Sequence, residues 1–283
     1  GEGGACFVWR AATGRTLCSL DSVRMQTVEV FPSGDRVLTW GHRTWGTVWD
    51  ASAGEVVCLM HRHASAVIVA GVSPRGDRMV TGSLDHTAVI WDASTCEALH
   101  VLDQSYWVTG VAFLMGGSKV ATLTASGGTT IWNAVTGERL RALVSPDIRH
   151  MNVAGVFVSF PRDDRLAIFD LGAVVVWNAS SGDALYRLAS DSPVGSIAVS
   201  PQGDVVATCD GIHIVLWDAG TGARLQTLPD VHPVSTVAPA VDPSGAVDVE
   251  RWPPTSCAVA IGFGGVLEPL GFGHGLSWEQ VAP

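Results

Sequence analysis

A tryptophan recurs at nearly constant intervals along this chain of 283 residues, and its recurrence limits the possible folds more than any other feature. Successive members of the series are 40, 42, 41, 45 and 40 residues apart. The series consists of Trp9, Trp49, Trp91, Trp132, Trp177 and Trp217. A period of this length indicates one repeated structural unit, in which each repeat buries its hydrophobic surface against its neighbours.

Two turns recur in phase with the tryptophans. The first follows each tryptophan directly, as in residues 49–54 (Trp-Asp-Ala-Ser-Ala-Gly). Counting from the tryptophan, alanine is third in all six copies and glycine is sixth in five, the exception being Cys96. The second turn lies upstream, as in residues 73–77 (Ser-Pro-Arg-Gly-Asp). Proline fixes φ and glycine or aspartate tolerates positive φ, so this segment is predicted to be a reverse turn.

Short segments rich in Val, Ile, Leu, Thr and Trp lie between these turns. Residues 78–82, 87–91 and 212–217 are examples. They have the length of strands and show no helical period. Each repeat is therefore predicted to hold four strands, a to d. The Pro-Gly turn joins a to b, the tryptophan closes c, and the Thr-Gly turn joins c to d.

A period of 40–45 residues with four strands per repeat resembles the WD40 family of β-propellers, and the resemblance covers residues 5 to about 245. It implies an all-β fold of four-stranded blades. It also implies a hydrogen-bonded set of His, Ser or Thr, Asp and Trp within a blade. The third repeat has the whole set, namely His63, Thr81, Asp85 and Trp91. The second repeat has Arg43 at the Asp place and the fourth has Ser126, so these two blades are expected to be held less firmly.

The resemblance predicts a propeller over residues 1–249 whose first blade is partial, with residues 1–20 supplying strands c and d alone. Residues 232–249 resemble an a strand, a turn and a short b strand. If these strands join the N-terminal pair, the ring has six blades and no open edge. The alternative is a seven-bladed ring truncated at its N-terminus, because the chain starts in the middle of a repeat. Residues 250–283 are rich in Gly and Pro and are expected to be a weakly ordered or irregular extension, or a strand that fills the gap.

Charge and cysteine usage exclude several classes of protein. The net charge is −10 and no basic stripe is visible, which disfavours nucleic acid and anionic membranes as partners. No apolar stretch is long enough to span a bilayer. The scattered cysteines include no C-x-x-C pair, so they are predicted to be buried free thiols in a reducing compartment. We therefore expect a cytoplasmic protein, with the nucleus as an alternative. The cysteines are Cys6, Cys18, Cys58, Cys96, Cys209 and Cys257.

The motifs that carry catalysis are missing from the sequence. There is no G-x-x-x-x-G-K-[ST] loop, no H-E-x-x-H helix and no G-x-S-x-G elbow. His61 and His63 would share one face of a strand and could both reach a zinc ion, but no third ligand is near in sequence. The chain is therefore predicted not to be an enzyme and to have no cofactor, metal or catalytic residue.

The strand order predicts where a partner binds. Strands a and c run one way and b and d the other, so the b–c and d–a loops lie on one face. Variable loops on a rigid frame commonly carry specificity, and Trp, Tyr and Arg are enriched in binding hot spots. Tyr106 and Trp107 form an aromatic pair that could instead pack under the neighbouring blade. The candidates are His42, Arg43, Trp45, His61, Leu84, His86, Tyr106, Trp107, Arg149 and His150.

The resulting hypothesis is a scaffold that binds a peptide or protein partner through this face. The alternative is a sensor or autoinhibitory propeller within a larger signalling protein, such as a NACHT-type NTPase, of which this chain is a fragment. Its partners would then be other domains of the same full-length chain. A propeller enzyme would instead need polar residues that converge on the central channel, and the sequence shows none.

Overall fold

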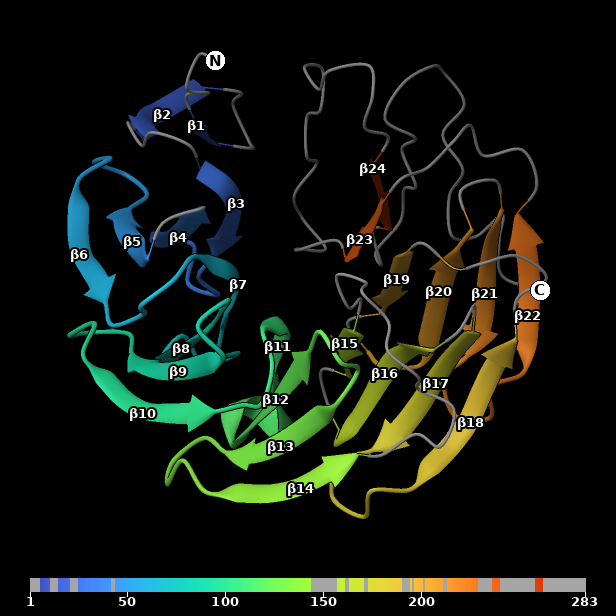
Figure 1. Cartoon of the computed structure of the whole chain (residues 1–283). Coiled ribbons are helices and arrows are strands. Elements are labelled where there is room, and N and C mark those ends of the chain that lie inside the picture. Colours follow the sequence, from blue (N-terminus) through green and yellow to red (C-terminus); the bar gives the residue numbers. More distant parts are fainter. Residues whose placement is uncertain are drawn as a thin grey trace. The chain divides into compact units, whose positions relative to one another are not determined.

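Within the residues that it describes, the computed structural model consists of β-strands and their connecting segments, with one 3-10 turn, η1 (Met115–Gly117) (Figure 1). The residues that the structure describes are 6–10, 15–20, 25–41, 44–143, 157–160, 163–170, 173–189, 194, 196–200, 202–210, 213–228, 236–239 and 258–261. The chain forms two compact parts. Lobe 1 comprises residues 1–155 and 179–182, and lobe 2 comprises residues 156–178 and 183–283.

Lobe 1 holds a two-stranded sheet and three four-stranded antiparallel sheets. The two-stranded sheet pairs β1 (Cys6–Arg10) with β2 (Arg15–Leu20). The first four-stranded sheet contains β3 (Met25–Val30), β4 (Arg36–Gly41), β5 (Trp45–Asp50) and β6 (Val56–His61). The second contains β7 (Val67–Val72), β8 (Arg78–Ser83), β9 (Thr87–Asp92) and β10 (Ala98–Asp103). The third contains β11 (Val108–Leu114), β12 (Lys119–Thr124), β13 (Thr129–Asn133) and β14 (Arg139–Leu143).

Lobe 2 holds two more four-stranded antiparallel sheets and one parallel pair. The first sheet contains β15 (Phe157–Ser159), β16 (Arg165–Asp170), β17 (Ala173–Asn178) and β18 (Ala184–Ala189). The second contains β19 (Ser196–Val199), β20 (Val205–Cys209), β21 (Ile214–Asp218) and β22 (Arg224–Leu228). The parallel pair is β23 (Thr236–Pro239) with β24 (Ala258–Ile261).

These sheets confirm the all-β fold of four-stranded blades predicted from the repeat. Every four-stranded sheet is formed by four strands consecutive in sequence, so one repeat makes one sheet. Strands β1 and β2 pair antiparallel over the residues where strands c and d of the first repeat were expected. Strand β23 lies where an a strand was expected, but its partner is β24, within the stretch expected to be irregular. The b strand expected before residue 249 lies outside the described residues.

The hydrophobic core lies between successive sheets of a lobe, so inner strands are buried on both faces. Strand β9 buries four consecutive residues, including Trp91, which is 2 % exposed. In lobe 1 this side chain shares a cluster with Phe31 and Met60 of the preceding sheet. A matching cluster in lobe 2 joins Phe160 to Trp217. The last strand of each repeat is more open, because Val57 of β6 and Leu99 of β10 remain exposed.

In four repeats the turn after the tryptophan is closed by the acidic or amide residue that follows it, namely Asp50, Asp92, Asn133 or Asp218. The carboxylate of Asp92 accepts backbone N–H bonds from Ser94 at 2.8 Å and Thr95 at 3.0 Å, and a hydroxyl bond from Ser94 at 2.6 Å. These bonds favour the charged form and lower the pKa of Asp92 to about 2. Asn133 accepts the equivalent backbone bonds in the next repeat. The recurrence of Asp or Asn after the tryptophan is therefore explained by turn closure.

The prediction that all cysteines are free thiols is wrong. Cys58 of β6 and Cys96 of the turn after β9 form a disulfide, with their Cα atoms 6.2 Å apart and a sequence separation of 38 residues. The two residues belong to successive repeats, so only the packing of one sheet on the next brings them together. Cys18 is half-buried and Cys209 is buried. Among the described residues, no helix has the length and apolar character needed to cross a membrane.

Candidate protein-binding face of lobe 1

Four loops of lobe 1 join to form one continuous surface, which we call the loop face. It comprises the d–a loops 62–66 and 104–107 and the b–c loops 84–86 and 125–128. Neighbouring loops are linked by backbone hydrogen bonds from Leu84 N–H to the Ala66 carbonyl (3.1 Å) and from Gln104 N–H to the His86 carbonyl (2.8 Å). A third bond runs from Ala125 N–H to the Trp107 carbonyl (2.9 Å). The relative positions of these loops are therefore fixed through the backbone.

A buried hydrogen-bonded set fixes two of these loops to the sheet below. Trp91 Nε1–H donates to Thr81 Oγ1 at 2.8 Å, and His63 Nε2 lies 2.7 Å from the same oxygen. The other ring nitrogen of His63 lies 2.9 Å from Asp85 Oδ2. Asp85 also accepts the backbone N–H of Ala64 at 2.8 Å. The set that the resemblance implied in the third repeat is thus present, and it connects loop 62–66 to loop 84–86.

The protonation of this set follows from its partners. A carboxylate only accepts hydrogen bonds, so His63 Nδ1 carries the proton donated to Asp85, and the Thr81 hydroxyl donates to Nε2. Burial lowers the pKa of His63 below its ordinary value and outweighs the opposing effect of Asp85. Burial alone would raise the pKa of Asp85, but hydrogen bonds from Thr87, Ala64 and His63 hold it below its ordinary value. His63 is therefore neutral and Asp85 charged at pH 7.

Acid is expected to destabilise lobe 1 in two stages. The unfolded chain binds a proton at His63 more readily than the folded chain does. The contribution of neutral His63 to the free energy of unfolding is therefore complete above about pH 6.5 and is lost as the pH falls. The depressed pKa of Asp85 adds a second loss below about pH 4. Urea denaturation of the wild type and of His63→Gln at several pH values measures this. The glutamine variant should lose the upper stage because an amide does not titrate, and equal pH dependence of both proteins would contradict the assignment.

Other repeats retain parts of the same set. Tryptophan N–H donates to threonine in three of them, in the pairs Trp49–Thr39 (2.8 Å), Trp132–Thr122 (2.9 Å) and Trp217–Thr208 (2.8 Å). In the fourth repeat Gln104 Nε2 donates to Thr122 at 3.0 Å and so takes the place of the histidine. The sequence reasoning missed Gln104, although it precedes Thr122 by 18 residues, as His63 precedes Thr81. In the repeat that contains Trp177, the threonine position is held by the buried Ile168.

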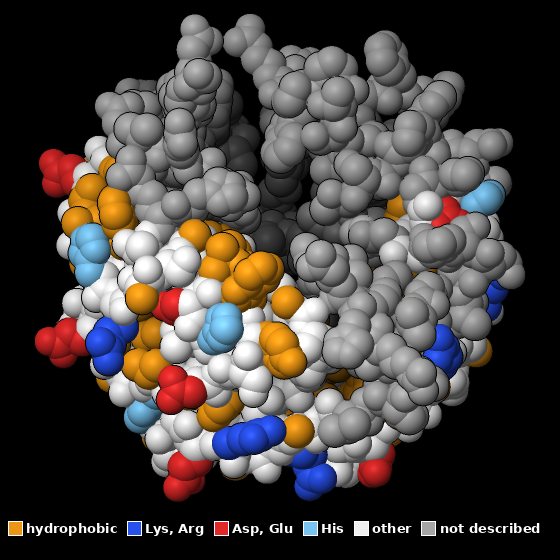
Figure 2. Space-filling model, viewed as in Figure 1, with side chains coloured by type: hydrophobic (Ala, Val, Ile, Leu, Met, Phe, Trp, Pro, Cys, Tyr) orange, Lys and Arg blue, Asp and Glu red, His pale blue; other side chains and the backbone are white. Residues whose placement is uncertain are grey.

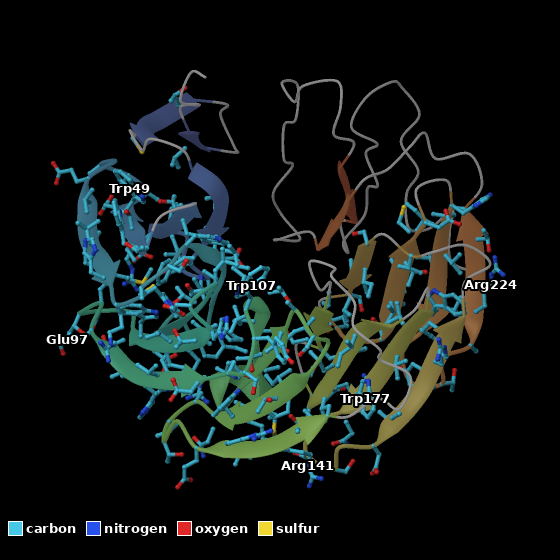
Figure 3. The ribbon with its side chains drawn as sticks, in the orientation of Figure 1. Trp49, Glu97, Trp107, Arg141, Trp177 and Arg224 are labelled. Atoms are coloured by element: carbon cyan, nitrogen blue, oxygen red, sulfur yellow. A yellow bond between two sulfur atoms is a disulfide. The ribbon has the colours of Figure 1, made fainter. Side chains whose placement is uncertain are left out.

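Tyr106 and Trp107 are exposed on the loop face. Their side chains are 52 % and 47 % exposed, so neither is tucked under the neighbouring sheet. Hydrophobic side chains gather on the visible side of lobe 1 in Figure 2, in the area where Figure 3 labels Trp107. Leu84, on the adjacent loop, is half-buried. The structure therefore brings three of the predicted apolar candidates onto neighbouring loops.

His86 has an unusual backbone conformation. Its φ is +71°, in the left-handed region that favours glycine, and its side chain is exposed. The same turn position in the next sheet is held by Gly127, with φ +83°. Both residues follow a threonine of the buried set, Thr81 or Thr122, by five positions. The turn thus requires positive φ, and this repeat adopts it with a side chain present.

Trp45 and His61 form a second small group in lobe 1. They are opposite each other in the β5–β6 register, with ring centroids 5.3 Å apart. This contact and the bonding of His63 place the two histidines in different surroundings. Within the described residues, no group of three His, Cys, Asp or Glu side chains could hold a metal ion. The candidates His42, Arg43, Arg149 and His150 lie outside the described residues.

Comparison with known protein families bears on the family resemblance stated from the repeats. Residues 54–92, which run from the end of one c–d turn to the end of strand β9, match the family described as WD domain, G-beta repeat. The comparison with curated proteins gives no match. WD40 domains generally bind protein partners and act as scaffolds without catalysing a reaction. The matched segment contains Thr81, Asp85 and Trp91, and the same turn and Trp–Thr bond recur in other repeats. The match over residues 54–92 and the four-stranded antiparallel sheets are consistent with a WD40-repeat β-propeller.

Proposed function

We propose that the loop face of lobe 1 binds a peptide or protein partner, and that the protein holds partners together without catalysis. The observation that carries this proposal is the pair of half-exposed aromatic side chains, Tyr106 and Trp107, on a loop whose backbone is fixed on both sides. Within the described loop face, Arg62 is the one exposed cation and no exposed cluster of one charge is present. This composition favours a partner recognised mainly by apolar and neutral polar contacts.

Fixed loops make the aromatic pair energetically suited to binding. Association has an entropic cost for each loop and side chain that becomes ordered, and a loop that is already ordered avoids most of it. Tyrosine and tryptophan are also enriched among the few interface residues that contribute most of the binding energy. The backbone bonds of Gln104 and Trp107 hold both ends of loop 104–107. The half-buried Leu84 and exposed His86 on the adjacent loop extend the same surface.

His86 supports the same surface through its backbone. Positive φ disfavours a residue with a β-carbon by about 1 kcal/mol relative to glycine. Such conformations persist where surrounding structure fixes them, and they cluster at sites of function. The buried set beside the loop supplies that support, since Asp85 precedes His86 and accepts three hydrogen bonds from Ala64 and Thr87. A side chain retained at this position is consistent with a contact made by the imidazole.

Affinity capture followed by quantitative mass spectrometry tests the proposal. Tyr106→Ala/Trp107→Ala is expected to reduce the amount of at least one captured protein by about 10-fold or more, because both anchors are removed from the surface. The matched control is Leu99→Ala/Val101→Ala on β10. These side chains are 41 % and 40 % exposed and lie on the strand that leads into loop 104–107, but outside the loop face. Circular dichroism checks that both variants fold. The proposed face would be contradicted if both variants lost the captured protein equally, or if neither variant lost it.

His86→Gly separates binding from folding on the same surface. Glycine suits the positive φ, so the variant should be as stable as the wild type or more stable by up to about 1 kcal/mol. Capture of the same partner should nevertheless weaken. If the propeller instead regulates another domain of a longer chain, the same variants would alter that domain and leave separate partners unaffected. Unchanged capture with increased stability would remove His86 from the proposed surface.

A further inference from the structure

One contact between successive sheets recurs along the chain. The residue nine positions after each repeat tryptophan lies on the d strand, and at four junctions it contacts the residue five positions after the next tryptophan. At three junctions the second residue is glycine with positive φ, covered by a larger side chain. A β-carbon at Gly137 would lie 2.9 Å from His100 Cβ, and one at Gly222 would lie 3.3 Å from Tyr186 Cβ. The third junction pairs Gly182 with Arg141.

The junction between β6 and the turn after β9 departs from this pattern at both positions. Cys58 replaces the covering side chain, and Cys96 replaces the glycine. Cys96 retains φ of +57°, a conformation that disfavours any residue with a β-carbon. The two cysteines are bonded, and their Cα separation of 6.2 Å lies in the usual range for a disulfide. Cysteine also holds the d-strand position in the first repeat, as Cys18, but Cys96 alone departs from the glycine of the turn. This unfavourable departure, placed where it meets a second thiol, indicates that the pair has a role that glycine does not fill.

We propose that Cys58 and Cys96 are a thiol oxidation site, and that their redox state sets the stability of lobe 1. The disulfide ties the outer strand of one sheet to the turn of the next and closes a loop between residues 38 apart. Such a cross-link restricts the unfolded chain and so favours the folded state. The equivalent contacts at His100 and Arg141 have no sulfur, so within these described junctions the covalent tie is specific to one place.

The oxidation requires a small-molecule disulfide of the glutathione type. Cys58 is half-buried and Cys96 is 7 % exposed, so Cys58 is the more accessible residue and is assigned the first attack. Its thiolate attacks the small disulfide, the S–S bond breaks, and one small thiolate leaves. The Cys96 thiolate then attacks the Cys58 sulfur and releases the second small thiolate. The two protons of the protein thiols pass to the two leaving groups, so two protein thiols are oxidised and one small disulfide is reduced to two thiols.

Peptide mapping without reduction and thermal melting test this site in the full chain. We expect a linked peptide containing Cys58 and Cys96, and a melting temperature of lobe 1 that is roughly 5–15 °C lower after treatment with a dithiol reductant. Cys96→Gly should melt below the oxidised wild type and ignore the reductant. Cys58→Ser should melt lower still, since it keeps a β-carbon at positive φ without the cross-link. A reductant effect of the same size in Cys96→Gly would overturn the proposal.

A transplanted pair shows whether the junction geometry itself permits the bond. Tyr186→Cys/Gly222→Cys places two thiols at the equivalent contact in lobe 2, where the β-carbons would be 3.3 Å apart. We expect this variant to form a second linked peptide under the same oxidant. If the transplanted pair cross-links while Cys58 and Cys96 stay reactive to a thiol reagent in the oxidised, folded protein, the proposal is wrong. A linked native pair whose reduction leaves melting unchanged would also overturn it.

Discussion

Replacing Thr81 with valine is expected to lower the free energy of unfolding of lobe 1 by about 2–4 kcal/mol. The two side chains have nearly the same volume, so the variant removes the hydroxyl without leaving a cavity. That hydroxyl accepts from Trp91 Nε1 and bonds to His63 Nε2, and both nitrogens are buried. Each would be left without its partner, at a cost of about 1–3 kcal/mol for a buried polar group. Urea denaturation followed by tryptophan fluorescence measures the loss.

Thr39→Val is the matched control for this prediction. Thr39 is as buried as Thr81 and accepts from Trp49 Nε1, but its repeat has Arg43 where the third repeat has Asp85. Thr39→Val leaves only the Trp49 N–H without its partner, whereas Thr81→Val leaves two nitrogens without theirs. The expected loss in the free energy of unfolding is therefore smaller, about 1–2 kcal/mol. If both variants lose the same stability, the histidine and aspartate add nothing to the Trp–Thr bond. The greater firmness expected of the third blade would then be refuted.

Replacing Arg165 with methionine is expected to lower the stability of lobe 2 by about 2–3 kcal/mol. Arg165 at the start of β16 donates to the carbonyls of Ala219 and, at 3.0 Å, Gly203, which belong to turns of the following sheet. Its guanidinium also lies 4.2 Å from the ring centroid of Phe160 and pairs with Asp163. Methionine keeps most of the aliphatic packing, so the loss would report the charge-assisted bonds between the two sheets.

Arg224→Met is the control for the arginine experiment. Arg224 lies on the exposed outer strand β22, and its guanidinium donates to Thr227 three residues away at 2.6 and 2.9 Å. A local bond at an exposed position contributes little, so the expected change is within about 0.5 kcal/mol. Thermal melting of both variants gives the comparison. A loss at Arg165 no larger than that at Arg224 would show that the bonds to Ala219 and Gly203 do not stabilise the packing of the two sheets.

The local structure could be predicted from the sequence because its determinants lie close together along the chain. Proline, glycine and aspartate specify their turns within five or six residues, and the strand segments between them carry their own pattern of apolar residues. The repeat also supplied the family resemblance, which implied the bonded set around His63 and Thr81. Residues 18 apart in that set could be assigned because the repeat fixes their register. Gln104 has the same spacing and was missed because only histidine was sought there.

The contacts between repeats depended on the tertiary structure. No pattern within one repeat shows that Cys58 meets Cys96, because their bond requires the d strand of one sheet to lie beside the turn of the next. The exposure of Tyr106 and Trp107 was equally undetermined, since the same sequence is compatible with packing under a neighbour. The sequence by itself determined the strands and turns of the repeats and the family resemblance, because these follow from local backbone preferences and a fixed period. Only the tertiary structure decided which side chains meet across sheets and which remain exposed, because that outcome depends on how whole sheets pack.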